Sequence, residues 1–129
     1  LSQYTDPKID VDFDFFIPDS YINNERERIM VYHRLVNFNS LEQLEKFKLE
    51  LKDRFGTLPE EVNNLIDCIE IKIFGGRVYA SHIFLNKTIL KINFSLKAQQ
   101  DEKFYSQVIQ KLLNQKETKI QFSFFFFFK

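Results

Sequence analysis

The chain has 129 residues, a formal net charge of zero, and a composition that is 44% hydrophobic and 28% charged, which is typical of one soluble globular domain. No apolar run is long enough to span a membrane and no charged-then-apolar leader opens the chain, so we expect no membrane partner. Because residue 1 is Leu, we expect residues 1–129 to be a single-domain fragment of a longer protein. Residues 1–8 would be a linker and residues 125–129 a Phe-rich tail.

Charge is divided unevenly between the two parts of the chain. Residues 1–70 carry 15 acidic and 8 basic side chains, whereas residues 71–129 carry 3 acidic and 10 basic ones. Either the two parts attract each other across the fold, or the acidic part forms a face for a basic partner. Charge alone favours the first explanation.

Residues 9–15 alternate between apolar and acidic side chains. The apolar set is Ile9, Val11, Phe13 and Phe15, and the acidic set is Asp10, Asp12 and Asp14. This period of two predicts a half-buried strand. A row of aspartates suggests a cation site, but along a straight strand it more often forms a solvated face that protects an edge, since calcium ligands gather in a curved loop. We therefore expect no metal there.

A helix is expected after Asn23 or Asn24, either of which can serve as its N-cap. Its predicted inward face consists of Ile29, Tyr32, Leu35 and Val36. His33 lies next to this face and could titrate near neutral pH, but we interpret it as a surface histidine without a function.

Residues 40–66 predict a helix, a tight corner and a second helix. Ser40 and Gln43 have the spacing of a capping box, and Gly56 follows the last apolar residue of the first helix, where a left-handed residue ends a helix. Pro59 stands where the second helix should begin. The first apolar stripe is Leu44, Phe47, Leu51 and Phe55, and the second is Val62, Leu65, Ile66, Ile69 and Ile73. The corner is short, so the two helices should be neighbours in space.

The rest of the chain predicts a small sheet and one more helix. These elements are strands at 80–85 and 88–96 around a turn at Asn86-Lys87, a helix at 101–114 and a strand at 118–124. Five consecutive phenylalanines, Phe124 to Phe128, then form a segment with the signature of an aggregation hazard. Together the elements predict an α+β domain, with N-terminal helices packed on a small, mostly antiparallel sheet.

No group of residues predicts catalysis. Gly75-Gly76 lacks the Lys-Ser/Thr of a phosphate-binding loop, and the chain has no nucleophile elbow and no His pair at metal-ligand spacing. The paired carboxylates Glu60-Glu61 are explained by a helix dipole. The single cysteine, Cys68, excludes an internal disulfide and fits a reducing cytoplasm. We expect no enzyme activity, metal or cofactor.

Nucleic-acid binding is a second hypothesis, because the basic part of the chain also carries aromatic rings. The residues concerned are Lys87, Lys91, Lys97 and Lys119, near Phe84, Phe94, Phe104 and Phe122. Stacked rings and lysines can hold a single strand. However, Phe94 and Phe122 fall on the apolar phase of their strands, and only one arginine, Arg77, lies in this part. We therefore do not expect direct DNA binding.

A set of motifs lies between residues 8 and 74. It comprises Ile9-Asp10-Val11, Ile17-Pro18-Asp19-Ser20-Tyr21-Ile22, Glu25-Arg26, Tyr32-His33-Arg34-Leu35 and, most specifically, Glu50-Leu51-Lys52-Asp53-Arg54-Phe55-Gly56-Thr57-Leu58-Pro59. These motifs resemble the C-terminal (TRCF) domain of the bacterial transcription-repair coupling factors, the Mfd family. The resemblance implies that the helix after Pro59 continues through Gly75-Gly76 to about Val78, although two helical glycines cost about 2 kcal/mol in total.

The resemblance also implies a function. Such factors are large ATP-dependent DNA translocases that remove stalled RNA polymerase and recruit the excision-repair protein UvrA. In the family, this domain packs on an N-terminal UvrB-like region and hides its UvrA-binding surface until polymerase is engaged. The implied role is thus a non-catalytic regulatory domain, with the UvrB-like region as direct partner and UvrA and RNA polymerase as indirect ones. The alternative is an accessory DNA-binding domain of the same translocase.

The implied partner surface is the outer side of the helix at 41–55. In the family, the acids before Arg-Phe-Gly contact basic residues of the UvrB-like region, and the matching positions here are Glu50 and Asp53. They are three residues apart and therefore neighbours on the helix surface. Leu49 also faces away from the apolar stripe, and an outward leucine beside two acids suits the centre and rim of an interface. The alternative is that all three are ordinary solvated side chains.

Overall fold

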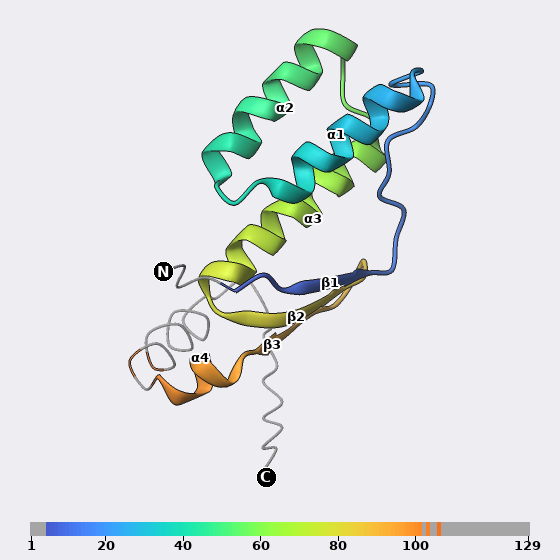
Figure 1. The fold of residues 1–129 in the computed structure, drawn as a ribbon. Coiled ribbons are helices and arrows are strands. Elements are labelled where there is room, and N and C mark those ends of the chain that lie inside the picture. Colours follow the sequence, from blue (N-terminus) through green and yellow to red (C-terminus); the bar gives the residue numbers. More distant parts are fainter. Residues whose placement is uncertain (1–4, 102, 104–105, 107–129) are drawn as a thin grey trace.

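The computed structural model describes residues 5–101, 103 and 106, in which three long helices stand above a small sheet (Figure 1). The elements in chain order are β1 (Lys8–Val11), α1 (Glu25–Asn37), α2 (Leu41–Phe55), α3 (Glu60–Arg77), β2 (Ala80–Leu85), β3 (Leu90–Phe94) and α4 (Leu96–Gln100). The helix expected at 101–114 falls largely outside the described residues, and the strand at 118–124 and the Phe124–Phe128 tail fall wholly outside them. The predicted α+β class is confirmed.

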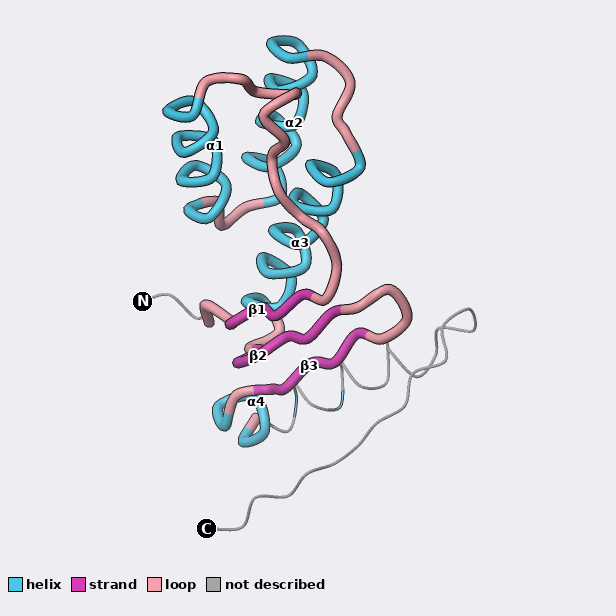
Figure 2. Tube along the Cα trace, turned by 90° about the vertical axis from the view of Figure 1, so that its right-hand side faces the viewer, coloured by secondary structure: helices cyan, strands magenta, loops and turns pink. Residues whose placement is uncertain are grey.

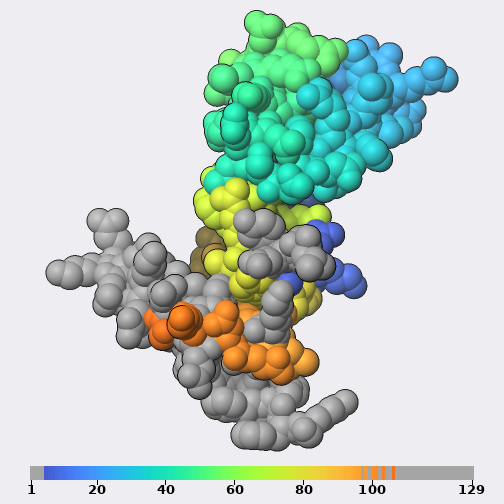
Figure 3. Space-filling view, turned by 60° about the vertical axis from the view of Figure 1, so that its left-hand side comes forward, coloured from blue at the N-terminus to red at the C-terminus, as the bar shows by residue number. Residues whose placement is uncertain are grey.

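The hydrophobic core lies between α1, α2 and α3, which form a lobe at the end of the molecule away from the sheet (Figures 1 and 3). Its buried members are Ile17, Ile22, Val31, Leu35, Leu44, Phe47, Leu51, Leu58, Val62, Leu65, Ile66, Ile69 and Ile73. This set contains the whole predicted stripe of α3 and three of the four residues predicted for α2. The fourth, Phe55, is half-buried against the cluster. The two stripes were therefore predicted correctly.

The sheet has the strand order β1-β2-β3 and is mixed rather than mostly antiparallel (Figure 2). β1 runs parallel to β2, with Ile9 opposite Ile83, and β3 runs antiparallel to β2, with Ile92 opposite Ile83. Parallel neighbours need a long connection, and the three helices between β1 and β2 supply it. The antiparallel hairpin of β2 and β3 is the one expected from the sequence.

Helix α3 joins the helical lobe to the sheet, and it continues through Gly75-Gly76 to Arg77, as the resemblance implied. Both glycines are buried because other segments approach the helix closely there. A Cβ on Gly75 would collide with Ile83 Cδ1, and a Cβ on Gly76 would lie 2.6 Å from the backbone oxygen of Thr5. The loss of helix propensity at two glycines is thus offset by close packing against β2 and the N-terminal segment.

Two predicted strands are shorter in the structure. The strand expected at 9–15 ends at Val11, because β2 ends opposite it and the Asp12 N–H donates the last bond to Leu85 O, at 2.8 Å. The apolar–acidic alternation continues beyond the sheet, and Phe15 is 39% exposed. The strand expected at 88–96 is β3 alone. Leu96 instead begins α4, since the Ser95 hydroxyl caps that helix by accepting the Ala98 N–H.

The inward face predicted for α1 is wrong in part. Val31 and Leu35 are buried, whereas Ile29 and Val36 are 59% and 54% exposed. The side of α1 that packs on the rest of the domain includes polar side chains, which the spacing of apolar residues in the sequence does not reveal. Arg28 donates to the backbone oxygens of Ile22 and Asn23, and the Tyr32 hydroxyl accepts the Ile17 N–H at 2.6 Å. Arg28 and Tyr32 therefore lie, with Val31 and Leu35, on the side of α1 that contacts the rest of the domain.

Candidate interaction surface on helix α2

Local signals fix the position of α2 along the chain. The Ser40 hydroxyl accepts the Gln43 N–H at 3.1 Å, as the predicted capping box requires. The Gln43 side chain bonds the Asn39 N–H, at 3.4 Å, rather than the N–H of Ser40. Gly56, with φ 89°, ends the helix and donates its N–H to Lys52 O at 2.9 Å. The helix therefore starts and stops where the sequence predicts.

The outer side of α2 forms part of the molecular surface (Figure 3). Leu49 is 65% exposed, and Asp53, one turn later, is also exposed. No ion pair or hydrogen bond involves the Asp53 carboxylate among residues 5–101, 103 and 106. These two residues lie on the surface as expected, and their assignment to a partner stays a prediction.

Glu50 is in a different environment, because α1 provides a cation for it. Arg34 Nη1 lies 3.0 Å from Oε1 of Glu50 and Arg34 Nη2 lies 3.1 Å from Oε2, which is a two-pronged pairing. The hydrogen bond from Arg34 is the main cause that lowers the pKa of Glu50 below its usual value. The Glu50 side chain is 39% exposed, so this pair lies at the rim of the α1–α2 contact.

A second arginine extends this pairing into a network. Arg54 Nη2 lies 3.2 Å from Glu27 Oε1, and Arg54 Nη1 lies 4.0 Å from Glu50 Oε1. Glu27, Arg34, Glu50 and Arg54 together constitute the α1–α2 charge network. Its four formal charges cancel. Asp53 lies outside the network and, like exposed Glu45 on the same side of α2, has no ion-pair partner among the described residues.

Each arginine of the network also packs over an aromatic ring of α2. The guanidinium carbon of Arg34 is 4.2 Å from the centre of the Phe47 ring, and that of Arg54 is 4.7 Å from the centre of the Phe55 ring. Such cation–π contacts contribute about 0.5–1 kcal/mol at exposed sites. The two arginines of the network therefore pack on one core residue, Phe47, and one half-buried residue, Phe55, which restricts where their charges can move.

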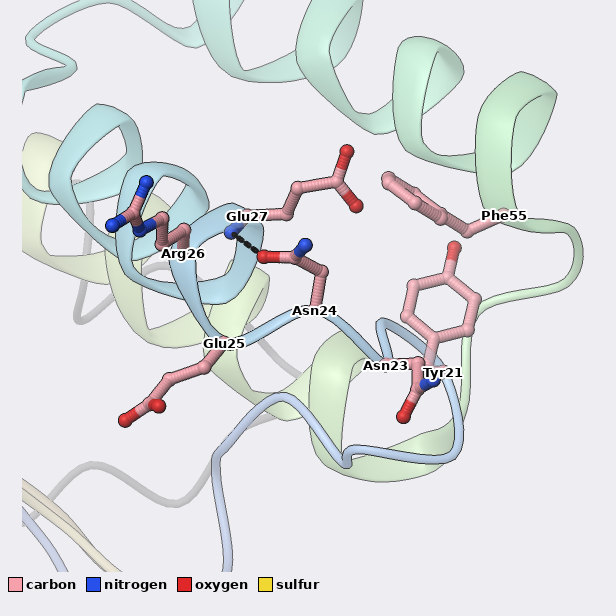
Figure 4. Close-up of a pocket in the computed structure, with 7 residues that line it drawn as sticks. All are labelled: Tyr21, Asn23, Asn24, Glu25, Arg26, Glu27 and Phe55. Atoms are coloured by element: carbon pink, nitrogen blue, oxygen red, sulfur yellow. Dashed lines mark hydrogen bonds between the residues drawn. The ribbon is translucent and has the colours of Figure 1, made fainter.

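An open pocket lies at one end of this network, between the start of α1 and the end of α2 (Figure 4). It is lined by Tyr21, Asn23, Asn24, Glu25, Arg26, Glu27 and Phe55. Several of its polar groups serve local structure: the Asn24 side chain accepts the Glu27 N–H, and the Tyr21 hydroxyl lies 2.9 Å from Gly56 O and 3.1 Å from Leu51 O. Burial raises the pKa of Tyr21. We assign no ligand to this pocket.

The structure also shows the surroundings of the other residues considered as sites in the sequence, within the described part of the chain. Asp10 lies 2.6 Å from His82 Nε2, across β1 and β2, so one of the three aspartates has a neighbour in the sheet. Cys68 is buried, and His33 is exposed beside Asn37. Residues 5–101, 103 and 106 contain no group of three or more His, Cys, Asp or Glu that could hold a metal ion. Within the same residues, no helix is both long and apolar enough to cross a membrane.

The sequence did not indicate Arg34 as part of this surface. It lies 16 residues before Glu50, on another helix, and an exposed arginine in an amphipathic helix carries no signal of its own. Only the packing of α1 against α2 brings the two side chains together.

Comparison with known proteins identifies the domain. The family described as "TRCF domain" matches residues 11–105, which is most of the chain. The chain belongs to the TRCF domain family. The resemblance noted from the motifs is thereby confirmed, and the matched domain is not a helicase or ATPase domain.

Relatives of this TRCF domain are found in several bacteria. A transcription-repair-coupling factor of Rickettsia prowazekii is 44% identical over 73 residues, which are 57% of this chain and 6% of that protein. One from Staphylococcus aureus is 32% identical over 100 residues, or 78% of this chain and 9% of that protein. A crystal structure of the C-terminal domain of a transcription-repair coupling factor matches with a TM-score of 0.67 at 25% identity, covering 77% of this chain and 63% of that one. The TRCF domain thus spans less than a tenth of the length of these curated relatives.

Proposed function

We propose that this TRCF domain is a non-catalytic regulatory domain that packs on the UvrB-like region of a transcription-repair coupling factor. In this state it masks the UvrA-binding surface of that region, and release follows when the factor engages RNA polymerase. Membership of the TRCF domain family supports a transcription-repair coupling factor as the parent protein. The observation that carries the proposal is that exposed Leu49 and exposed Asp53 are neighbours on the outer side of α2, and that Asp53 has no ion-pair partner among the described residues.

The physical character of this surface suits a releasable contact. An exposed leucine provides an apolar centre, and an adjacent acid provides a charged rim that selects a basic partner. The inner side of α2 is fully used by the core, so substitutions on its outer side leave folding largely intact. Exposed substitutions usually change the free energy of unfolding by no more than about 0.5 kcal/mol.

The test uses the full-length factor that contains this domain. Leu49→Ser combined with Asp53→Lys should weaken the masking contact and increase UvrA binding, measured by titration with labelled UvrA. Reversal of Glu50 is a poorer choice, because a lysine there would face Arg34 at the α1–α2 contact.

A matched control is Asp67→Lys, which makes the same charge reversal at an exposed position on α3. It should leave UvrA binding at the parent level. Unchanged UvrA binding by the Leu49 and Asp53 variant would refute the proposed masking surface. If the isolated chain instead retarded DNA in a gel mobility assay, with an affinity that falls as salt rises, the DNA-binding alternative would replace the proposed masking role.

A further inference from the structure

Glu50 and Asp53, which the motif comparison assigns to one partner surface, have different surroundings in the folded domain. Both carboxylate oxygens of Glu50 are engaged by Arg34, at 3.0 and 3.1 Å. Asp53 has no such cation in the described part of the chain. A basic side chain that approaches the outer side of α2 can therefore pair with Asp53 directly, but at Glu50 it meets a carboxylate that already has a partner.

We infer that Arg34 is an internal competitor for Glu50, so that docking exchanges its guanidinium for a basic side chain of the partner. This inference rests on the proposed function, because it concerns the regulation of that same surface. It assigns the two acids different roles. Asp53 attracts a basic side chain of the partner with its full charge. Glu50 contributes less to the free energy of docking, because its ion pair with Arg34 must first break.

The geometry makes such an exchange feasible. The side chains of Arg34 and Glu50 are 46% and 39% exposed, so they can separate without opening the core. Arg34 also has a second contact that survives the exchange, because its guanidinium lies over the ring of Phe47. Exposed ion pairs change an equilibrium constant by only about two- to fivefold, so one pair of this kind can replace another.

Arg54 is a weaker competitor than Arg34. Its nearest approach to Glu50 is 4.0 Å, whereas it lies 3.2 Å from Glu27. Its position over the Phe55 ring further restricts its movement toward Glu50. Loss of Arg34 should therefore leave Glu50 largely free for a partner.

The test is a calorimetric titration of the 129-residue chain with the isolated UvrB-like region of the parent factor at low salt. Arg34→Gln should bind about two- to fivefold more tightly than the parent chain, because an exposed ion pair no longer opposes docking. Asp53→Asn should bind more weakly. In a Glu50→Gln background, Arg34→Gln should have no further effect, because the carboxylate in question is gone.

Two variants separate competition from a general change of charge. Arg26→Gln removes the same charge from an exposed position of α1 that has no ion pair among the described residues, and it should bind like the parent chain. Arg34→Lys keeps the charge but cannot form the two-pronged pair, so it should bind more tightly than the parent. Thermal melts of every variant show whether the fold is retained.

The outcomes distinguish this inference from the proposed function. If the parent chain binds but both Arg34 variants bind equally well or more weakly, Arg34 does not compete for Glu50 and the inference is wrong. If Arg34→Gln tightens binding no more than Arg26→Gln does, the effect is net charge, and the inference is again wrong. If the folded parent chain does not bind the UvrB-like region at all, the proposed function itself fails.

Discussion

Gly75 on α3 lies directly against Ile83 on β2, so closely that a Cβ at residue 75 would collide with the Ile83 side chain. Gly75→Ala should therefore lower the free energy of unfolding by about 1–3 kcal/mol through overpacking, even though alanine favours a helix. Gly76→Ala should be at least as harmful, because its new methyl group would meet the fixed backbone oxygen of Thr5. Urea unfolding followed by circular dichroism measures both effects.

A helix-favouring substitution elsewhere on α3 provides the control. Asp67→Ala, at an exposed position of the same helix whose side chain has no hydrogen bond or ion pair among the described residues, should change stability far less than either glycine variant. A stabilising effect of Gly75→Ala would show that α3 is not in close contact with β2 at this residue, and a stabilising effect of Gly76→Ala would show the same for α3 and the segment at Thr5.

Tyr21 should stabilise the end of α2 through its hydroxyl. That hydroxyl lies within hydrogen-bonding distance of the backbone oxygens of Leu51 and Gly56, and its ring packs against Phe55 with the ring centres 5.8 Å apart. Tyr21→Phe keeps the ring but removes the hydrogen bond, so we expect a loss of about 1 kcal/mol in chemical denaturation. Tyr21→Ala should cost clearly more. Equal stabilities of Tyr21→Phe and the parent would mean that the hydroxyl contributes nothing.

Cys68 should be unreactive in the folded domain. Burial is the main cause that raises the pKa of its thiol from 9.0 to about 11, with the Asp67 charge as a smaller cause. Because the thiolate is the nucleophile, iodoacetamide should modify Cys68 at neutral pH only after unfolding. Mass spectrometry with and without urea tests this, and rapid modification of the native chain would contradict it.

The same thiol should make stability fall at alkaline pH. Between about pH 9 and pH 11 the unfolded chain loses the Cys68 proton while the folded domain keeps it, so the unfolded state binds fewer protons. The free energy of unfolding should then decrease with rising pH by at most about 1.4 kcal/mol per unit from this group. Cys68→Ala should show a shallower decrease over this window than the parent. Parallel curves for the two proteins would exclude the contribution.

Glu50 should affect stability at acidic pH in the opposite direction. Its pKa is lowered, chiefly by the hydrogen bond from Arg34, so its contribution is present above its unfolded value of 4.5 and is lost as the pH falls through the folded value. Solvent screening keeps this contribution small, because the side chain is 39% exposed. Glu50→Gln should reduce the acid-induced loss of stability, measured by thermal melting from pH 6 to 3. Asp53→Asn, which breaks no ion pair among the described residues, provides the comparison.

Local sequence signals determined where α2 and α3 lie and which faces they bury. Ser40 and Gly56 mark the ends of α2 because capping depends on the side chain and backbone of a few adjacent residues. The stripes on α2 and α3 were predicted correctly because each consists of apolar residues at helical spacing. The exposure of Leu49 and Asp53 follows from the same periodicity.

Tertiary structure alone decided the features that depend on distant partners. The length of β1 depends on where β2 ends, and the inward side of α1 depends on backbone groups that Arg28 and Tyr32 reach. The state of Glu50 depends on Arg34, 16 residues away on another helix. Periodicity reports which side chains avoid water, but it holds no information about which polar groups meet when two helices pack. For this reason the sequence could place Glu50 on the surface, and only the folded domain could show that its charge is already compensated.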